Sequence, residues 1–282
     1  MTESSTDERS TDERSTDERP IGVFDSGLGG LTVVRAIREH LPNENIVYLG
    51  DTARVPYGTR SAQTVVRYAR SCARALAAHD PKLLVVACNT VSAVALDMLR
   101  VELDIPVLGV ISPGARAGVE ASKTGRIAVI ATAGTVASGA YGRAIAAIDS
   151  RIELRSLAAP LLVPLAEEGW LEGEVPERVI ERYLSPLAGS GVDALILGCT
   201  HYPLFRGLIE GVGHRVAGPE LVVADSAEAT ALELASLLES RDMAGSGPGS
   251  LEVMVTDLPA RFTAVAARFL GAEVPDVRSI DL

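Results

Sequence analysis

The feature that most constrains the fold is a regular alternation, from residue 21 onward, of short β-branched apolar runs with Ala-, Leu- and Arg-rich stretches of helical spacing. The runs predict buried strands at residues 21–24, 45–49, 83–87, 105–111, 126–131, 152–157, 193–198, 221–224 and 251–255. Strands that alternate with helices indicate an α/β fold with mostly parallel sheets. In such folds the functional residues follow the carboxyl ends of the strands.

Two pairs of similar segments predict that the chain consists of two related halves. The segment PKLLVVACNT (81–90) resembles VDALILGCTH (192–201), and residues 21–37 resemble residues 127–145 at a similar spacing. Buried parallel strands all look alike, which is the alternative explanation, but it does not predict a cysteine at the equivalent strand end of both halves. We therefore predict two related α/β domains that face each other, one formed by residues 20–111 and 224–282, the other by residues 112–223. The strands near 221 and 251 are expected to return to the first domain.

The composition excludes several classes of function. With 282 residues, of which 47% are hydrophobic, the chain can bury a large core. Its net charge of -11 and its lack of a basic cluster argue against nucleic acid as a primary partner. No apolar run reaches the roughly 18 residues that span a bilayer, and the N-terminus lacks the apolar region of a signal peptide. We therefore expect no membrane partner and a cytoplasmic location.

Residues 1–19 repeat Ser-Thr-Asp-Glu-Arg three times, with no apolar residue after Met1. Such a segment cannot offset its ordering entropy by burial, so we expect a disordered acidic tail. A misassigned start codon is the alternative origin of the segment, and neither origin puts a site residue in doubt.

Two of the three cysteines stand at the ends of predicted core strands. Cys88 and Cys199 each lie where a strand turns into a helix, and the N–H groups of a helix N-terminus should lower the thiol pKa and favour the thiolate. Cys72 lies in a predicted helix and is expected to pack as a small hydrophobe. Each strand-end cysteine alone fits a core role, but the matched pair predicts catalysis.

Two ionisable residues accompany these thiols. Asp25 closes the first strand before a glycine-rich turn, where it can accept a proton from Cys88 or orient it, although a helix cap is an alternative role. His201 follows Cys199 by two residues, and a histidine beside a cysteine is the usual partner in forming a thiolate.

The sequence gives little support for a metal or a cofactor. Cys199-Thr-His201 has no accompanying C-x-x-C or H-x-x-x-H, so no metal is expected. Residues 27–32 lack the third glycine of a dinucleotide-binding loop, and there is no P-loop. The only lysines are Lys82 and Lys123. Lys82 comes at the start of a predicted strand, away from the strand end where the site is expected, and Lys123 lies in a loop. A pyridoxal Schiff base is therefore not expected.

Six motifs in order resemble the glutamate racemase family over essentially all of residues 20–282. They are GVFDSGLGGLTV (22–33), YLGDTARVPYG (48–58), VVACNTVSA (85–93), ATAGTVAS (131–138), VPLAEEG (163–169) and LGCTHYPL (197–204). The resemblance implies racemisation of L-glutamate to D-glutamate for peptidoglycan synthesis, with neither metal nor pyridoxal. It also implies two pseudo-symmetric α/β domains with the active site between them.

The resemblance also implies roles for individual residues. Cys88 and Cys199 resemble the two acid–base thiols, supported by Asp25 and His201 respectively, and Glu167 matches an acidic residue near the histidine. The positions that match substrate-contacting residues are Ser26, Tyr57, Gly58, Asn89, Thr90 and Thr200, with Thr135 as a further candidate.

Three alternatives stay open at this point. The same paired thiols would serve a racemase of aspartate or of a hydantoin. A binding or regulatory protein could use this fold without catalysis, and a redox protein would bring Cys88 and Cys199 close enough to form a disulfide. The helix surfaces are too rich in alanine to single out an interface, so a homodimer is an open alternative to a monomer.

Overall fold

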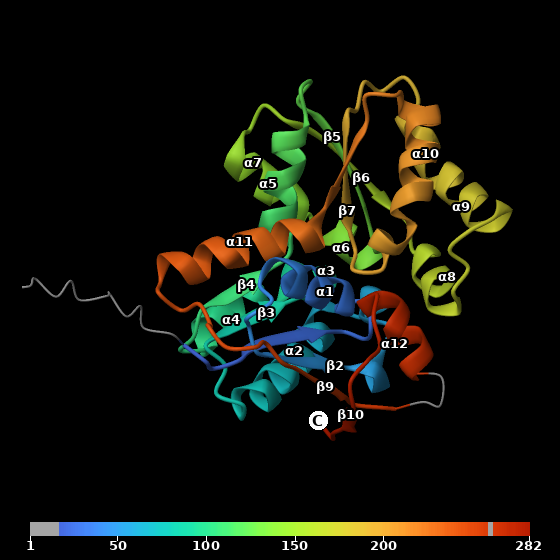
Figure 1. Ribbon diagram of the computed structural model, residues 1–282. Helices are drawn as coiled ribbons and strands as arrows, with labels where there is room; N and C mark the ends of the chain where they lie inside the picture. Colours follow the sequence, from blue (N-terminus) through green and yellow to red (C-terminus); the bar gives the residue numbers. More distant parts are fainter. Residues whose placement is uncertain (1–16, 259–261) are drawn as a thin grey trace, which may run out of the picture.

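Two parallel sheets form the framework of the computed structural model, which describes residues 17–258 and 262–282 (Figure 1). The first sheet contains β1 (Ile21–Asp25), β2 (Ile46–Gly50), β3 (Leu83–Val86), β4 (Val107–Gly109), β9 (Leu251–Val255) and β10 (Val277–Ser279), in the order β10-β9-β2-β1-β3-β4. The second contains β5 (Arg126–Ala131), β6 (Glu153–Ala158), β7 (Ala194–Gly198) and β8 (Val222–Asp225), in the order β6-β5-β7-β8. All pairings between these strands are parallel, which confirms the α/β class.

The strand order confirms the predicted likeness of the two halves. Within the first sheet, β2-β1-β3-β4 follows the same order as β6-β5-β7-β8 in the second, and β9 and β10 extend the first sheet at one edge. The strands β3 and β7 are therefore equivalent, and Cys88 and Cys199 come directly after them. The two thiols thus occupy matching places in two related sheets.

One strand lies in a different sheet from the one predicted. The apolar run near residue 221 was expected in the first half, but β8 pairs with β7 in the second sheet and is the equivalent of β4. An apolar run shows that a strand is buried and does not show which sheet it joins. The chain returns to the first sheet only after α11 (Ser226–Ser240), through β9. The strand β10 has no apolar run, because it is a short and largely exposed edge strand.

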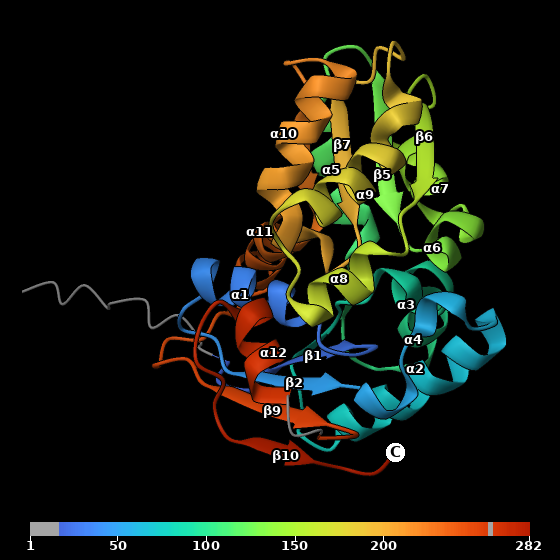
Figure 2. The same cartoon turned by 90° about the vertical axis from the view of Figure 1, so that its right-hand side faces the viewer.

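Helices cover both faces of each sheet (Figure 2). Around the first sheet lie α1 (Leu31–His40), α2 (Ala62–Ala77), α3 (Asn89–Val94), α4 (Leu96–Glu102) and α12 (Phe262–Leu270). Around the second lie α5 (Ile111–Ala121), α6 (Ala133–Ser138), α7 (Ala140–Ile148), α8 (Leu162–Glu168), α9 (Glu174–Leu184) and α10 (Arg206–Ala217). Short 3-10 turns are η1 (Thr52–Arg54), η2 (Tyr57–Thr59), η3 (Ser185–Leu187) and η4 (Tyr202–Phe205). None of the helices in the described ranges is both long and apolar enough to cross a membrane.

The cores follow from the alternation of side chains along each strand. In β3, Leu83 and Val85 belong to the core shared with α1 and α12, whereas Leu84 and Val86 belong to the core shared with α2. In the second sheet, α5 and α7 cover one face and α9 and α10 the other (Figure 1). The helix α11 packs on both α1 and α5 and so connects the two halves. Both sheets are covered on two sides, and their carboxyl edges remain for the site.

The segment just before β1 is held by a buried lysine. The Nζ atom of Lys82 lies 2.6 Å from Oε2 of Glu44 and donates to the carbonyl oxygens of Asp17 and Met243 at 2.6 and 2.7 Å. Glu18 accepts a hydrogen bond from the backbone N–H of Ser246 at 3.0 Å. The expectation of a disordered tail is therefore wrong for residues 17–19, and residues 1–16 lie outside the described part of the chain.

Candidate active site

A cleft of about 310 Å³ lies where the two halves meet. Its walls come from the segments that follow β1, β2 and β3 of the first sheet and β5, β6 and β7 of the second. All the predicted site residues line it except Asp25, which ends β1 beside it, and Thr135. The carboxyl edges of the two sheets thus contribute equally to one cavity, as expected for an α/β fold.

Cys88 follows β3 and lies buried at the first residue before α3. Its Sγ donates to Oγ of Ser26 at 3.2 Å. Burial, together with the negative charge of Asp25, raises the pKa of the Cys88 thiol to about 12. The expectation that the helix N-terminus lowers this pKa is therefore wrong, because desolvation of a thiolate outweighs the effect of a single short helix.

Asp25 is buried at the end of β1, and its two oxygens have different surroundings. Oδ2 accepts from the backbone N–H of Gly27 at 3.1 Å, while Oδ1 is buried without a hydrogen-bond partner. Burial raises the pKa of this carboxyl. Gly30 must be a glycine here, since a Cβ at that position would lie 2.5 Å from Cβ of Asp25. An unpartnered buried acceptor beside a cleft is suited to a cationic group of a ligand.

Cys199 follows β7 and has the predicted histidine beside it. Its Sγ lies 3.9 Å from Nδ1 of His201, and Nε2 of His201 lies 3.1 Å from Oε1 of Glu167 on α8. Burial alone would lower the pKa of His201, but the hydrogen bonds and charges of Cys199 and Glu167 raise it to about 10. The imidazole is therefore protonated at neutral pH and presents a positive charge to the sulfur.

Amide and hydroxyl groups occupy the floor between the thiols. Oδ1 of Asn89 accepts from the hydroxyl of Tyr141 at 2.8 Å, and its Nδ2 is buried without a partner. The hydroxyl of Thr90 lies 3.1 Å from that of Thr132 and 3.3 Å from that of Thr135. Thr135 is thus behind the cleft wall and contacts Thr90 instead of the cavity.

The segment after β2 forms the outer wall of the cleft. Tyr57 is buried and its hydroxyl donates to Oδ2 of Asp51, so the phenol oxygen is already bonded. Gly58 faces Thr132 of the other half, where a Cβ on Gly58 would lie 3.0 Å from Cβ of Thr132. The predicted residues Tyr57 and Gly58 therefore contribute a buried ring and a close contact between the halves.

A second close contact between the halves lies on the glycine-rich turn. A Cβ at Gly29 would lie 2.2 Å from Oγ1 of Thr200 and 2.5 Å from Nδ1 of His201. The hydroxyl of Thr32 donates to the carbonyl oxygen of Thr200 at 2.9 Å. The loop that carries Cys199 therefore rests directly on the turn after β1.

The cleft has few charged groups in its lining. No lysine or arginine occurs among the described residues that line the cleft. The positive group in this lining is the His201 imidazolium. An anionic ligand would therefore be held by N–H and hydroxyl dipoles. Within the described ranges no group of three His, Cys, Asp or Glu side chains is placed to hold a metal ion.

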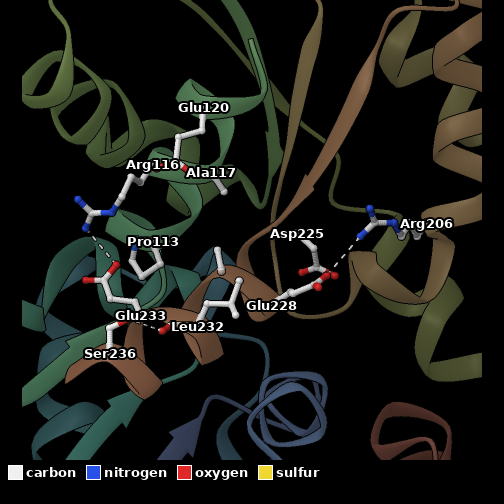
Figure 3. Close-up of a pocket in the computed structure, with 11 residues that line it drawn as sticks. Pro113, Arg116, Ala117, Glu120, Arg206, Asp225, Glu228, Leu232, Glu233 and Ser236 are labelled. Atoms are coloured by element: carbon white, nitrogen blue, oxygen red, sulfur yellow. Dashed lines mark hydrogen bonds and ion pairs between the residues drawn. The ribbon is translucent and has the colours of Figure 1, made fainter. Parts of the chain in front are cut away.

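A larger cavity of about 530 Å³ lies between α5, α11 and Arg206 (Figure 3). Its lining contains no cysteine or histidine, and its arginines are directed at carboxylates: Arg116 lies 3.0 Å from Glu233 and Arg206 lies 4.0 Å from Glu228. Volume alone would favour this cavity, but the nucleophiles and the unpartnered polar atoms are at the smaller cleft.

Sequence reasoning missed several wall residues of the cleft. They are Val55, Pro56, Thr59, Thr132, Ala133, Pro160, Val163 and Pro164. Thr132 could have been predicted by the same strand-end rule, because it follows β5 directly, as Cys88 comes after β3. The prolines carry no chemical group that marks them in a sequence. Cys72 lies on α2 and its side chain is fully buried in a hydrophobic core, as predicted.

Comparisons with known proteins agree with this geometry. The family described as Asp/Glu/Hydantoin racemase matches residues 21–234. Glutamate racemase of Chlorobaculum tepidum is 46% identical over 266 residues, covering 93% of this chain and 96% of that protein. The crystal structure of glutamate racemase isoform RacE1 from Bacillus anthracis superposes with a TM-score of 0.89 at 37% identity, covering 94% of this chain and 98% of the other. That of the Francisella tularensis glutamate racemase, in complex with D-glutamate, gives 0.86 at 37% identity with the same coverage. The chain belongs to the Asp/Glu/hydantoin racemase family and, within it, to the glutamate racemases.

Proposed function

We propose that the chain racemises glutamate by a 1,1-proton transfer between two thiols, Cys88 and Cys199, without metal or pyridoxal. The observation that carries this proposal is the position of the two cysteines, which follow equivalent strands of two related sheets and line one cleft. Inversion of a stereocentre by proton transfer requires one group on each face of the carbon. Two matched sulfurs on opposite domains are suited to that arrangement.

The two sulfurs have different surroundings. The pKa of Cys88, raised to about 12, keeps it a thiol at neutral pH, so it is ready to donate a proton. The imidazolium of His201 lies 3.9 Å from Sγ of Cys199, so its positive charge faces the sulfur that we assign to removing a proton. In one direction the Cys199 thiolate takes the α-proton and the Cys88 thiol delivers another to the opposite face. The transfer leaves Cys199 as thiol and Cys88 as thiolate, and the reverse reaction uses them in that state.

Substrate binding itself helps to prepare Cys88 for the reverse direction. The negative charge of Asp25 contributes to the raised pKa of Cys88, and Oδ1 of Asp25 has no partner. The ammonium group of an amino acid bound at Oδ1 would neutralise that charge and so favour the Cys88 thiolate. We therefore assign Asp25 to the substrate ammonium and to tuning the first thiol, and His201 with Glu167 to the second.

The remaining polar groups hold the carboxylates and stabilise charge as the α-carbon becomes carbanionic. Nδ2 of Asn89 and the hydroxyls of Ser26, Thr90 and Thr200 are donors or can become donors at the cleft. Pre-organised donors in a cavity from which water is excluded stabilise developing charge most effectively. Tyr57 and Gly58 close the outer wall.

The proposal extends to the biological role. The product D-glutamate would supply peptidoglycan synthesis in the cytoplasm, and the only partner required is the amino-acid substrate. A homodimer is an alternative to the monomer, and sedimentation velocity separates the two.

The test is cofactor-free incubation with L-glutamate in D2O, following α-deuterium incorporation and loss of optical rotation. We expect Cys88→Ala and Cys199→Ala to abolish racemisation while thermal unfolding stays cooperative. Cys72→Ala, which removes a buried thiol outside the cleft, is the matched control and should retain turnover. Full activity of either strand-end variant contradicts the two-thiol mechanism, and L-aspartate run in parallel tests the rival substrate.

A further inference from the structure

Unpartnered buried polar atoms are concentrated at the active site. Among the described residues, three buried side-chain nitrogen or oxygen atoms have no hydrogen-bond partner: Oδ1 of Asp25, Oε2 of Glu44 and Nδ2 of Asn89. The Glu44 atom is in an ion pair with Lys82 at 2.6 Å, so it is compensated. The atoms of Asp25 and Asn89 are the two without compensation. Buried polar groups are almost always satisfied, whereas the described residues supply no partner for either of these two atoms.

The orientation of the Asn89 amide decides whether its donor faces that ligand. An amide carries an acceptor at one end and a donor at the other, and its two orientations fill the same space. In this protein the hydroxyl of Tyr141 donates to Oδ1 at 2.8 Å, which fixes the acceptor end and leaves Nδ2 free. Asn89 is 3% exposed and is one of the residues that line the cleft, and its unpartnered Nδ2 is buried within that wall.

Tyr141 belongs to the opposite domain from Asn89. It lies on α7, is 3% exposed and packs in the core between the second sheet and α5, whereas Asn89 begins α3 beside the first sheet. The phenol is outside the cleft lining. Burial also raises the pKa of the Tyr141 hydroxyl above its ordinary value, so the hydroxyl keeps its proton and remains a donor at neutral pH.

We propose that Tyr141 is a positioning residue of the racemase: its hydroxyl, reaching across the domain boundary, holds the Asn89 amide so that Nδ2 donates to a carboxylate oxygen of the bound amino acid. This inference rests on the proposed function, because it needs an anionic amino acid in the cleft. It also makes the Asn89 contact depend on how the two domains are placed, since donor and acceptor come from different halves.

The test is Tyr141→Phe, which keeps the ring and removes the hydroxyl. Oδ1 of Asn89 then loses its donor and the amide is free to turn, so we expect KM for glutamate to rise roughly tenfold, the effect of losing one hydrogen bond to a charged group. The value of kcat should change much less. Tyr183→Phe removes a phenol hydroxyl that accepts from the backbone N–H of Leu161, and it is the matched control. It should leave KM unchanged.

A purely structural role of Tyr141 would lower Tm and leave KM alone, and that result overturns the inference. A double-mutant cycle with Asn89→Ala gives the second criterion. If Tyr141 acts through Asn89, Tyr141→Phe adds no further rise in KM to the Asn89→Ala enzyme, whereas additive effects contradict the assignment. The Kd of D-glutamate, measured calorimetrically on each variant, keeps this question apart from catalysis. A parent protein that binds D-glutamate without racemising it refutes the proposed function, and the Kd comparison still decides the role of Tyr141.

Discussion

Gly29 lies where the two domains touch, and replacing it by alanine should separate the two thiols. The Cβ of alanine would lie 2.2 Å from Oγ1 of Thr200 and 2.5 Å from Nδ1 of His201. Ordinary contact begins near about 3.4 Å, so the side chains of Thr200 and His201, in the loop after β7, must shift by about 1 Å to accept the methyl group. That loop carries Cys199, and the hydrogen bond from the Thr32 hydroxyl to the carbonyl oxygen of Thr200 holds it against the first domain.

A displacement of about 1 Å in a site that needs both sulfurs at one carbon costs roughly 100-fold in rate. We therefore expect Gly29→Ala to lose about two orders of magnitude in kcat/KM, while each domain keeps its own core. The assay is the initial rate of α-deuterium incorporation from L-glutamate and from D-glutamate, with circular dichroism and thermal unfolding on the same samples.

Gly207→Ala is the matched control, because it places a methyl group on α10 with nothing within 4 Å. We expect normal rates and unchanged or slightly higher stability, since alanine is the better helix former. A Gly29→Ala enzyme that stays within about threefold of the parent rate would refute the claim that this glycine sets the spacing of the two halves.

Two further predictions concern charge and the N-terminal segment. Glu167→Gln removes one of the groups that raise the pKa of His201 to about 10, so the alkaline limb of the pH–rate profile should move to lower pH; an unchanged limb would exclude the Glu167–His201 pair from the titration. The folded pKa of His201 lies above its ordinary value of 6.5, so the stability that this group contributes is complete below pH 6.5 and is lost as the pH rises toward 10. Over this range the Tm of the parent should therefore fall more steeply with pH than the Tm of Glu167→Gln. Deleting residues 1–19 removes the carbonyl acceptor of Asp17 from the buried Lys82 ammonium, so Tm should fall by a few degrees, about 1 kcal/mol, while turnover per folded molecule stays the same; an unchanged Tm would show that this contact contributes nothing.

The elements of the fold and the position of the site were predictable because both follow local rules. Buried parallel strands appear in a sequence as short apolar runs, and the chemistry of an α/β fold follows the strand ends, which led directly to Asp25, Cys88 and Cys199. The sheet that β8 joins was not predictable in this way, since pairing of β8 with β7 is a long-range choice between equally apolar strands.

The electrostatics and the contacts between the halves also lay beyond the sequence. The predicted lowering of the Cys88 pKa used only its neighbours in the chain, whereas burial and the Asp25 carboxylate, 63 positions earlier, decide its direction. The bond between Tyr141 and Asn89 and the contact of Gly29 with Thr200 join different domains. Such pairs become visible only when both sheets have been placed.

The unequal surroundings of the sulfurs, a serine hydroxyl at Cys88 and an imidazole at Cys199, bear on how the enzyme treats the two hands of its substrate. Enantiomers have identical standard free energies, so thermodynamics forces kcat/KM to be the same in both directions whatever the protein does. The chemical difference between the halves can therefore appear only as changes in kcat and KM that cancel in the ratio kcat/KM. The hand that is held more tightly must be turned over more slowly, by the same factor.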